Sequence, residues 1–572
     1  MNEYLTLKTT NCKNCYKCIR HCPVKSIRFD NNQAHIITED CVLCGNCFVI
    51  CPQNAKEIRN DMGRAEALLR EAKEVYASVA PSFAANYGLP FSSLEKALKE
   101  LGFAGAEETA LGATIVKREY DELVSRGSQD VIISSCCHSV NQLIQKYYPA
   151  VLPSLAHIIS PMQAHCMDIK RRRPEAKTVF IGPCVSKKAE AETFAGFTDC
   201  ALTFEELSLW FETRKVSLTP EPEEANNNTL ARLFPLSGGI LRTMKKANRD
   251  YAYLSVDGME NCIRAVEDVA KGNLSKCFIE MSACPGSCVG GPVMNRGGQK
   301  DKTSSGFLPD GRRYYPVRDY IAVSSRAGSE DFPVESCSAE KLSKPMPSLM
   351  PRKIHLGESA ILEALRKMGK TRPEHELNCG TCGYNTCRDK AIAVLEGKAN
   401  LFMCLPYLIE KAKSFSDDII KNTPNGIIVL NEDMEVQEIN TAACRLLNIT
   451  ASHILGDQVV RILDPGPFLE AVEQKKNTYN KLTYLADYEK YVDETVIFDT
   501  NYHIIICIMR DVTEETNRKK TKEDFNRKTM EITDKIIEKQ MRAVQEIASL
   551  LGESTAETKI ALTKLKESLN DD

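Results

Sequence analysis

The sequence predicts a multidomain protein of mixed α/β and α+β class, and three observations lead to this prediction. A chain of 572 residues is too long for one ordinary domain. Its 24 cysteines fall mostly into short, regularly spaced runs. In the middle of the chain, short apolar runs alternate with helical stretches, which is the pattern of an α/β arrangement with buried strands.

The composition indicates a soluble protein, with 43% hydrophobic and 26% charged residues. The formal net charge of -3 gives no reason to expect nucleic acid or an anionic membrane as a partner. No segment approaches the ~20 apolar residues that span a bilayer, and the N-terminus lacks the basic and apolar regions of a secretory signal. We therefore expect a cytoplasmic protein, in which clustered cysteines bind metal and do not form disulfides.

Residues 1–60 contain two copies of the cysteine pattern C-x2-C-x2-C-x3-C-P. In bacterial ferredoxins the fourth cysteine of each run binds the other cluster. By this rule one [4Fe–4S] cluster binds Cys12, Cys15, Cys18 and Cys51, and the second binds Cys22, Cys41, Cys44 and Cys47. A zinc ribbon or a coincidental run is the alternative. The segment is thus a predicted ferredoxin-like domain with two clusters, and its chemistry is electron transfer.

Residues 61–345 are expected to form an α/β domain. A helix is predicted from Ala65 to Val75, and a strand from Ala77 to Ala80. Two further buried strands are predicted at Val131–Ile133 and Thr178–Ile181, and each leads directly into a loop with cysteines. Because open α/β sheets place their sites at the carboxyl ends of strands, these loops are candidate site loops.

Three loops of this region carry cysteines next to glycine, proline or lysine. They span residues 134–138, 182–190 and 280–291. Glycines let the backbone approach a cofactor closely, and four of these cysteines would suffice for one more cubane. Buried structural thiols are the alternative, which is normal for a single cysteine but unusual for paired ones beside Gly and Pro.

In order and spacing, the three loops resemble the signature motifs of the [FeFe]-hydrogenase catalytic domain, and Ser237-Gly238-Gly239 is also similar to that family. The resemblance covers residues 75 to 325. It implies an H-cluster: a [4Fe–4S] cluster joined to a diiron subsite with CO, cyanide and a bridging dithiolate, which dedicated maturation proteins insert. The implied cluster ligands are Cys137, Cys184, Cys284 and Cys288, with Cys288 as the bridge to the subsite.

The same resemblance implies roles for three polar residues. Cys136 would pass protons to and from the diiron subsite, and Lys187 would donate a charge-assisted hydrogen bond to a cyanide ligand, with Glu190 as a supporting carboxylate. Gly182 and Ser282 also belong to the cofactor environment, but the family usually has methionine at both positions. Losing two thioethers changes the packing and polarity beside the subsite.

Other departures concern the transfer of protons. His138 follows Cys137 where prototypes of the family carry proline. The family usually has two proton-path glutamates, for which Glu119 and Glu122 are the candidates. We therefore expect that the site keeps its cofactor ligands but has a changed cofactor environment and proton route, with slow turnover.

Residues 346–412 are expected to form a small domain after a linker marked by prolines 345, 347 and 351. A helix is predicted from Glu358 to Lys367 and another between Cys387 and Cys404. The pattern C-x2-C-x4-C-x16-C resembles a small [4Fe–4S] module of several corrinoid and electron-transfer proteins. Its predicted ligands are Cys379, Cys382, Cys387 and Cys404. A zinc site is the alternative.

Residues 413–514 resemble a PAS domain. Strands are predicted at Gly426–Leu430, Val436–Asn440 and Tyr502–Arg510, and a helix at Ala442–Leu447. The sequence does not indicate a PAS ligand, and a small α+β domain used for dimerisation is the alternative.

Residues 515–572 are expected to form a helical signalling or dimerisation segment that Gly552 interrupts. It contains one apolar stripe, formed by Met530, Ile537, Met541, Val544, Ile547 and Leu551. Such a stripe suits a homodimer seam or a surface for a partner.

Together these features predict a hydrogen-sensing [FeFe] hydrogenase of low turnover, which interconverts H2 with two protons and two electrons. The expected partners are H2, protons, a redox carrier such as ferredoxin, and a signalling protein, either a kinase or a phosphatase. Two alternatives are a non-enzymatic iron–sulfur redox sensor without an active diiron site, and an ordinary ferredoxin-linked catalytic hydrogenase.

Overall fold

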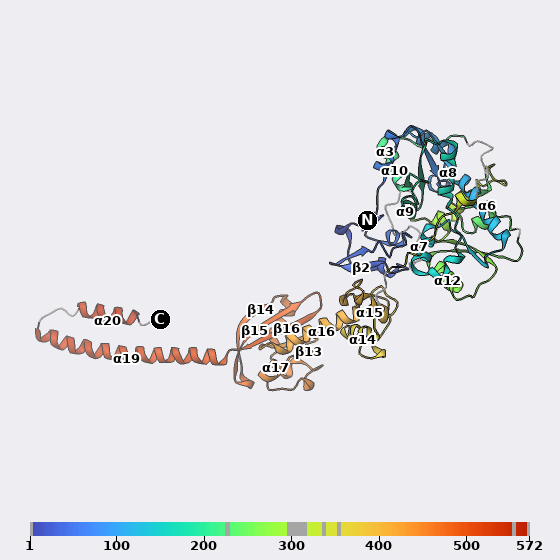
Figure 1. Cartoon of the computed structure of the whole chain (residues 1–572). Helices are drawn as coiled ribbons and strands as arrows, with labels where there is room; N and C mark the ends of the chain where they lie inside the picture. The colour runs from blue at the N-terminus through green and yellow to red at the C-terminus, as the bar shows by residue number, and fades with distance from the viewer. Residues whose placement is uncertain are drawn as a thin grey trace. The chain divides into compact units, whose positions relative to one another are not determined.

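The computed structural model describes residues 4–222, 229–246, 248–294, 317–334, 339–351, 356–551 and 556–568 (Figure 1). It divides into two compact units, Met1–Tyr407 and Leu408–Asp572. The first unit contains the ferredoxin-like, α/β and small cysteine-rich parts, and the second contains the PAS-like part and the C-terminal helices.

The ferredoxin-like part consists of two small antiparallel sheets and two short helices. One sheet pairs β1 (Leu5–Leu7) with β4 (Lys56–Ile58), and the other pairs β2 (Ile27–Asp30) with β3 (Gln33–Ile36). The helices are α1 (Lys17–Arg20) and α2 (Asn46–Ile50), and each lies inside one cysteine run. The two halves thus repeat one strand-and-helix unit, as the repeated cysteine pattern predicts.

The α/β part contains two parallel sheets. The first has the order β6-β5-β8-β9, with strands β5 (Val75–Val79), β6 (Gly105–Glu108), β8 (Lys177–Gly182) and β9 (Cys200–Thr203). The second has the order β10-β11-β7, with strands β7 (Val131–Ile133), β10 (Ala252–Asp257) and β11 (Cys277–Ser282). Both predicted strands that precede the first two cysteine loops are therefore present, one in each sheet.

Helices cover the two parallel sheets, as expected when strands are buried on both faces. They are α3 (Met62–Glu71), α4 (Phe83–Tyr87), α5 (Phe91–Glu100), α6 (Ala110–Arg126), α7 (His138–Tyr147), α8 (Pro161–Arg172), α9 (Ser186–Thr193), α10 (Phe204–Arg214), α11 (Gly239–Thr243), α12 (Met259–Ala270) and α13 (Val317–Ser324). The prediction of a helix from Ala65 to Val75 is wrong at its end. Val75 opens β5, a strand with all five residues buried, so burial in the sheet decides its conformation.

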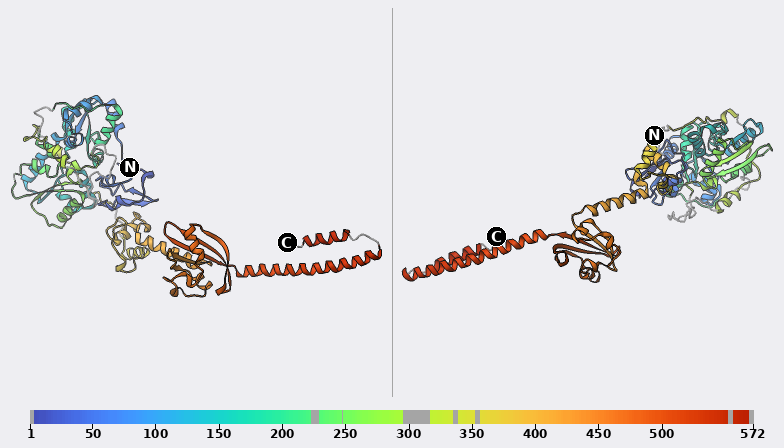
Figure 2. Two further views of the ribbon diagram at one scale, coloured as in Figure 1. Left: turned by 180° about the vertical axis from the view of Figure 1, so that it is seen from behind. Right: turned by 90° about the horizontal axis from the view of Figure 1, so that it is seen from below.

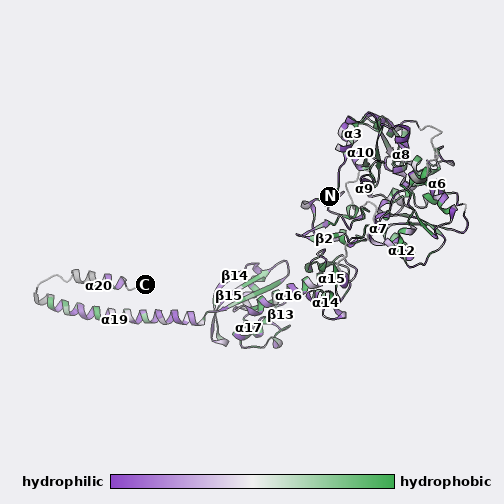
Figure 3. Cartoon of the chain, viewed as in Figure 1, coloured by the Kyte–Doolittle hydropathy of each residue, from purple (hydrophilic) through white to green (hydrophobic). Residues whose placement is uncertain are grey.

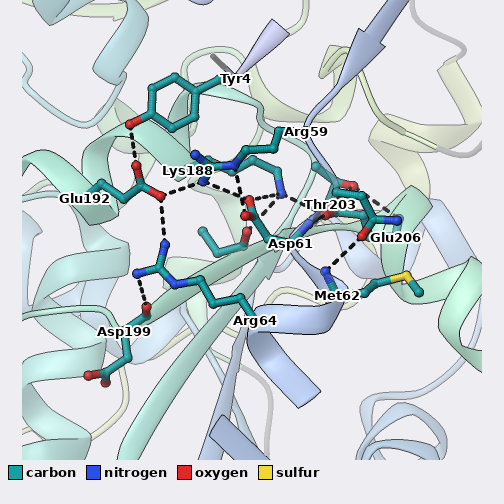
Figure 4. Close-up of polar contacts among 12 residues, drawn as sticks. Tyr4, Arg59, Asp61, Met62, Arg64, Lys188, Glu192, Asp199, Thr203 and Glu206 are labelled. Atoms are coloured by element: carbon teal, nitrogen blue, oxygen red, sulfur yellow. Dashed lines mark hydrogen bonds and ion pairs between the residues drawn. The ribbon is translucent and has the colours of Figure 1, made fainter. Parts of the chain in front are cut away.

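A polar network joins the ferredoxin-like part to α9 (Figure 4). Lys188, whose side chain is 1% exposed, lies 2.8 Å from Asp61 Oδ2 and 2.8 Å from Glu206 Oε1. Beside it, Glu192 accepts hydrogen bonds from Tyr4 Oη (2.7 Å) and from Arg59 (2.5 Å). These contacts hold α9 in place, and Lys187, next to Lys188 at the N-terminal end of this helix, lines the candidate site.

The proline-rich segment that follows the α/β part is not a free linker. Leu342, Lys344 and Met346 are buried, and Ile159 N donates to Leu342 O (2.8 Å). Gln145 donates from its side chain to Pro347 O (3.0 Å). The prolines end regular structure here, as expected, but alternate side chains still pack into the α/β core.

The small cysteine-rich part contains α14 (Glu358–Lys367), at the predicted bounds, and α15 (Cys387–Leu395). Thr386 caps α15 together with Asp389 in a capping box. Helix α16 (Leu405–Asn422) begins directly after Cys404 and leads to the first strand of the second unit.

The second unit contains a five-stranded antiparallel sheet in the order β13-β12-β16-β15-β14. Its strands are β12 (Gly426–Asn431), β13 (Val436–Ile439), β14 (Thr478–Leu485), β15 (Lys490–Asp499) and β16 (Ile504–Asp511), and its helices are α17 (Thr441–Leu446) and α18 (Gly466–Gln474). Both helices and the sheet contribute to one apolar core. The predicted elements are present within two residues of their expected bounds.

Helix α19 (Thr513–Leu551) continues from the sheet, and α20 (Ala556–Ser568) folds back along it, with Lys566 Nζ 2.6 Å from Asp534 (Figure 2). Figure 3 shows apolar residues recurring along a mainly hydrophilic α19, and Ile547 is 54% exposed. The predicted stop at Gly552 and the side chain of Leu551 lie outside the described residues. In the described part of the chain, no helix has the length and apolarity that crossing a membrane requires.

Candidate cofactor cavity and cysteine pockets

The three cysteine loops of the α/β part follow the carboxyl ends of parallel strands. Cys136 and Cys137 follow β7, Cys184 follows β8, and Cys284 follows β11. Helix α7 begins directly after Cys137, and α9 begins two residues after Cys184. Because helix N-termini favour negative charge, both loops suit ligands of an anionic cofactor.

The three loops line one shared cavity of about 110 Å³. It is lined by Cys136, Cys137, Cys184, Lys187, Ser282, Cys284 and Cys288, together with Cys44 of the ferredoxin-like part. Burial raises the pKa of Cys288 well above its usual value, and the nearby thiols of Cys184, Cys137 and Cys284 raise it further. Cys288 is one of the residues that line this cavity. The structure thus brings together the cysteines of all three loops.

The other predicted ligand sets line three smaller pockets of about 10 to 20 Å³. The first set is Cys12, Cys15, Cys18 and Cys51. The second, which we call the inner ferredoxin site, is Cys22, Cys41, Cys44 and Cys47. The third, which we call the fourth site, is Cys379, Cys382, Cys387 and Cys404. In both ferredoxin pockets, three cysteines of one run meet the last cysteine of the other run.

Among the described residues, no group of three His, Cys, Asp or Glu side chains is arranged to hold a single metal ion. A tetrahedral zinc site needs four ligands on one atom. A cubane binds each thiolate at a different iron, which requires a wider spacing. Each set supplies four thiols, which is the donor type and number that a [4Fe–4S] cluster needs.

A buried pair of charges stands at the wall of the large cavity. Lys187 contacts Glu190 through its ammonium group and donates to Cys136 O (3.1 Å). Burial disfavours the ammonium form, but Glu190 outweighs it and holds the pKa of Lys187 above its usual value. Burial would raise the pKa of Glu190, and the neighbouring ammonium groups instead hold it below its usual value. Both groups therefore stay charged.

Lys344 is a third member of this charge cluster, and sequence reasoning missed it. Its side chain is 1% exposed, and its Nζ lies 2.7 Å from Glu190 Oε1 and 3.2 Å from Gln163 Oε1. Glu190 is thus held between two lysines, with Ser160 donating to it as well (3.2 Å). While both lysines are protonated, the cluster carries one net positive charge, which suits an anionic cofactor.

Tyr120 is a second residue that the sequence did not point to. Its hydroxyl lies 3.2 Å from Cys136 Sγ and accepts from Ser135 N (2.9 Å), and its side chain is fully buried. Burial raises the pKa of Cys136 to about 12, although Tyr120 and Lys187 oppose the shift. The candidate glutamates lie elsewhere on α6: Glu122 is exposed and pairs with Arg126 at 2.5 Å, and Glu119 is half-buried.

Phe180 explains the glycine at position 182. A Cβ at Gly182 would lie 2.7 Å from Phe180 Cζ and 3.2 Å from Ala80 Cβ, which is closer than side chains normally approach. Phe180 itself lines the cavity. Ser282 is the second position at which the family usually has methionine, and its hydroxyl forms a hydrogen bond with Ser287 Oγ at 2.9 Å. One missing thioether is replaced by an aromatic ring and the other by a polar contact.

His138 is buried, and its Nδ1 has no hydrogen-bond partner within the described ranges. Burial lowers its pKa to about 3, so the imidazole is neutral at physiological pH. It lines the cavity next to Cys137.

Models of four known families match the chain. Residues 73–292 match the C-terminal domain of the iron-only hydrogenase large subunit. Residues 5–61 match a 4Fe-4S dicluster domain, residues 376–406 a putative Fe-S cluster domain, and residues 424–514 a PAS domain. These matches support [4Fe–4S] clusters and a diiron H-cluster as cofactors, and they favour iron over zinc at the fourth site.

Three curated proteins illustrate the similarity. Iron hydrogenase 1 of Clostridium pasteurianum is 26% identical over 51% of this chain, which spans 64% of that protein. The periplasmic [Fe] hydrogenase large subunit of Nitratidesulfovibrio vulgaris is 25% identical over 51% of this chain and 87% of its own. The nuclear prelamin A recognition factor of Xenopus laevis is 24% identical over 45% of this chain and 74% of its own. The chain is therefore an [FeFe]-hydrogenase-like protein with a 4Fe-4S dicluster domain and a PAS domain.

Proposed function

We propose that this chain is a hydrogen-sensing [FeFe] hydrogenase with low turnover. It converts H2 into two protons and two electrons, and the redox state of its clusters reaches the PAS domain and the C-terminal helices. The observation that carries this proposal is the cavity of about 110 Å³, which is lined by cysteines of three loops and by Lys187. It is several times larger than the pockets of the other cysteine sets, of about 10 to 20 Å³.

In this proposal Cys137, Cys184, Cys284 and Cys288 would hold the [4Fe–4S] part of the H-cluster, and Cys288 would also hold the diiron subsite. When bound, the subsite supplies the metal acceptor at which dihydrogen is split. Lys187 would donate a charge-assisted hydrogen bond to a cyanide ligand, since a fixed cation in a site shielded from water interacts strongly with an anion. Glu190 keeps this lysine charged and oriented, and Lys344 holds Glu190 from the opposite side.

Cys136 is the proposed proton carrier next to the subsite. Its Sγ faces the cavity and contacts the Tyr120 hydroxyl at 3.2 Å. A buried thiol beside a buried tyrosine, with no carboxylate in contact in the described part of the chain, exchanges protons slowly with solvent. Slow exchange limits turnover, and this limit supports sensing over metabolism.

The PAS domain and helices α19 and α20 form the proposed output. Helix α16 connects the fourth site to the PAS domain without an intervening loop at its start. The exposed apolar residues of α19, such as Ile547, suit a homodimer or a kinase or phosphatase partner. We propose that such a partner reads the signal and that a ferredoxin-type carrier returns the clusters to their oxidised state.

Infrared spectroscopy of protein produced with the hydrogenase maturation proteins tests the proposal. We expect CO and cyanide stretching bands, together with H2 oxidation at a rate orders of magnitude below that of catalytic hydrogenases. Bands with ordinary catalytic rates would instead support a metabolic hydrogenase. Absence of the bands would contradict the proposal.

The second candidate is a non-enzymatic redox sensor, and two observations favour it. The chain is similar over 45% of its own length, and 74% of the relative's, to a nuclear prelamin A recognition factor, and Gly182 and Ser282 replace residues that the hydrogenase family usually carries. In this case the cubane would be present and the diiron subsite absent, which the same infrared measurement distinguishes.

A further inference from the structure

The fourth site packs directly against the ferredoxin-like part. One apolar cluster contains Ile19, Phe29 and the thiols of Cys18 and Cys22 from one side, and Cys382, Tyr384, Ala399 and Met403 from the other. Phe29 N donates to Lys398 O (2.8 Å), and Lys398 Nζ lies 2.9 Å from Asp40. Two predicted electron-transfer sites thus share one hydrophobic core.

The backbones of the two cysteine loops touch at Gly383. This glycine has a φ of +94°, and a Cβ there would lie 2.9 Å from Ile19 Cγ2 and 3.2 Å from Arg20 N. Only glycine allows this approach without displacement of Ile19 or the backbone. The loop between Cys382 and Cys387 therefore lies in van der Waals contact with the loop that ends at Cys22.

Lys25 stabilises the contact between the two cysteine loops. Its Nζ donates to Gly383 O (2.8 Å), Arg20 O (2.9 Å) and Ile19 O (3.2 Å), so that one ammonium group binds both loops. Burial lowers the pKa of Lys25, and the thiols of Cys22 and Cys382 both oppose that shift. This lysine therefore lies within electrostatic range of one cysteine from each site.

Tyr384 lies at the same junction, and its hydroxyl group is available to donate a hydrogen bond. Its side chain is 3% exposed, and within the described residues its hydroxyl has no hydrogen-bond partner. Burial raises the pKa of Tyr384, and Cys382 and then Cys22 raise it further. A buried hydroxyl nearly always has an acceptor. Sulfur atoms of a cluster at the fourth site are acceptors of the required kind at this position.

We propose that the junction of Lys25, Gly383 and Tyr384 is the branch point at which electrons leave the ferredoxin domain for the fourth site. Cys44 lines both the large cavity and the inner ferredoxin site. Cys18 of the outer ferredoxin site and Cys22 of the inner site both belong to the apolar cluster at this junction, and Cys22 acts electrostatically on both Lys25 and Tyr384. The proposed route runs from the cavity through the inner site to the fourth site, without passing through the site of Cys12, Cys15, Cys18 and Cys51.

The step at this junction is the transfer of one electron, with no bond made and no proton moved. A reduced inner cluster loses the electron, and an oxidised fourth cluster gains it. The electron comes from H2 in the proposed function, on which this role rests, and from dithionite in the tests below. Tyr384 donates its hydroxyl hydrogen to sulfur at the fourth site and thereby stabilises the reduced, more negative cluster.

Electron paramagnetic resonance of the full chain, reconstituted with [4Fe–4S] clusters but without the diiron subsite and reduced by dithionite, tests the route. We expect spin–spin interaction between the fourth cluster and the inner ferredoxin cluster. It persists when Cys12→Ser and Cys15→Ser remove the outer ferredoxin cluster, and it is lost when Cys41→Ser and Cys44→Ser remove the inner one. The reverse pattern, or a magnetically isolated fourth cluster in the unmodified chain, would overturn the proposal.

Tyr384→Phe tests the junction without removing a ligand. We expect the reduction equilibrium of the fourth cluster to shift about tenfold toward the oxidised form, which is about 59 mV for a one-electron couple. Tyr502→Phe, at a tyrosine that is 77% exposed, is the matched control and should leave the potential unchanged. An unchanged potential in Tyr384→Phe would contradict the hydrogen bond to the fourth site.

These readouts need neither H2 nor the diiron subsite, so they separate the two proposals. Spin coupling without CO and cyanide bands in maturated protein would support the branch and contradict the hydrogenase function. Those bands with an isolated fourth cluster would support the hydrogenase function and contradict the branch.

Discussion

Replacing Lys188 with methionine is expected to destabilise the α/β domain strongly. The methionine side chain is nearly as long as the aliphatic part of lysine, so little packing is lost. The change instead leaves Asp61 and Glu206, each 2.8 Å from Nζ, without their shared cation. Removing one partner of a buried ion pair costs about 3–5 kcal/mol. Asp61 keeps Arg59 at 2.9 Å and Glu206 keeps the Thr203 hydroxyl at 2.8 Å, so we expect the lower limit, about 3 kcal/mol.

Urea unfolding followed by tryptophan fluorescence measures this change. Trp210 is the single tryptophan of the chain and is buried in the α/β core, so it reports on this domain alone. With a denaturant slope of about 3 kcal/mol per molar, the midpoint should fall by roughly 1 M. Lys73→Met removes an exposed pair with Glu175 and should leave the midpoint unchanged. A Lys188→Met midpoint equal to that of the unmodified protein would refute the assigned role of the network.

Three further predictions concern the site and the modular arrangement. Burial raises the pKa of Glu280 to about 7, above its usual value. The folded protein favours the protonated carboxyl of Glu280, so its contribution to stability is complete below pH ~4.5 and is lost as the pH rises through about 7. Glutamine does not ionise, so in Glu280→Gln the urea midpoint should fall less between pH 5 and pH 8 than in the unmodified protein. A parallel fall in both proteins would contradict this linkage. Cys136→Ala should leave the iron content unchanged and reduce H2 oxidation at least a hundredfold, and full activity would remove this thiol from the proton route. Removal of residues 408–572, which form a separate compact unit, should retain the H2 reaction and abolish binding of a signalling partner, whereas loss of the H2 reaction would argue against independent units.

The cysteine sites were the most predictable part of the molecule, for a geometric reason. Ligands two residues apart in one loop must lie close together, so the pattern at Cys12–Cys22 defines most of a site from local geometry. The exchange of the fourth cysteine between runs follows from the pseudo-symmetry of the repeated unit. Both ferredoxin pockets have the expected lining. The ligand role of these thiols stays a prediction, which the spectroscopic measurements above address.

Lys344 and Tyr120 were not predictable, because their positions depend on long-range packing. Lys344 stands in a segment whose prolines indicate a linker, and its approach to Glu190 depends on backbone pairing with residues 157–159 far away in the chain. Tyr120 lies between two glutamates that match the expectation of a carboxylate proton path. The direction of α6 turns the tyrosine, and not those glutamates, toward Cys136. Helical periodicity identifies a buried face but does not reveal which neighbour meets it.

Phe180 and Gly182 show why a departure from a family pattern needs its neighbours to be understood. Taken alone, glycine in place of methionine predicts a void beside the cofactor, which would admit water or gas and weaken the packing. Phe180 and Gly182 are two residues apart on β8, so their side chains point to the same face of the strand. The ring of Phe180 occupies the space in which a Cβ at position 182 would lie, 2.7 Å from Cζ. The thioether is thus exchanged for a rigid apolar ring at the cavity wall. Methionine at position 182 would clash with that ring unless Phe180 became smaller at the same time, so the two positions must change together.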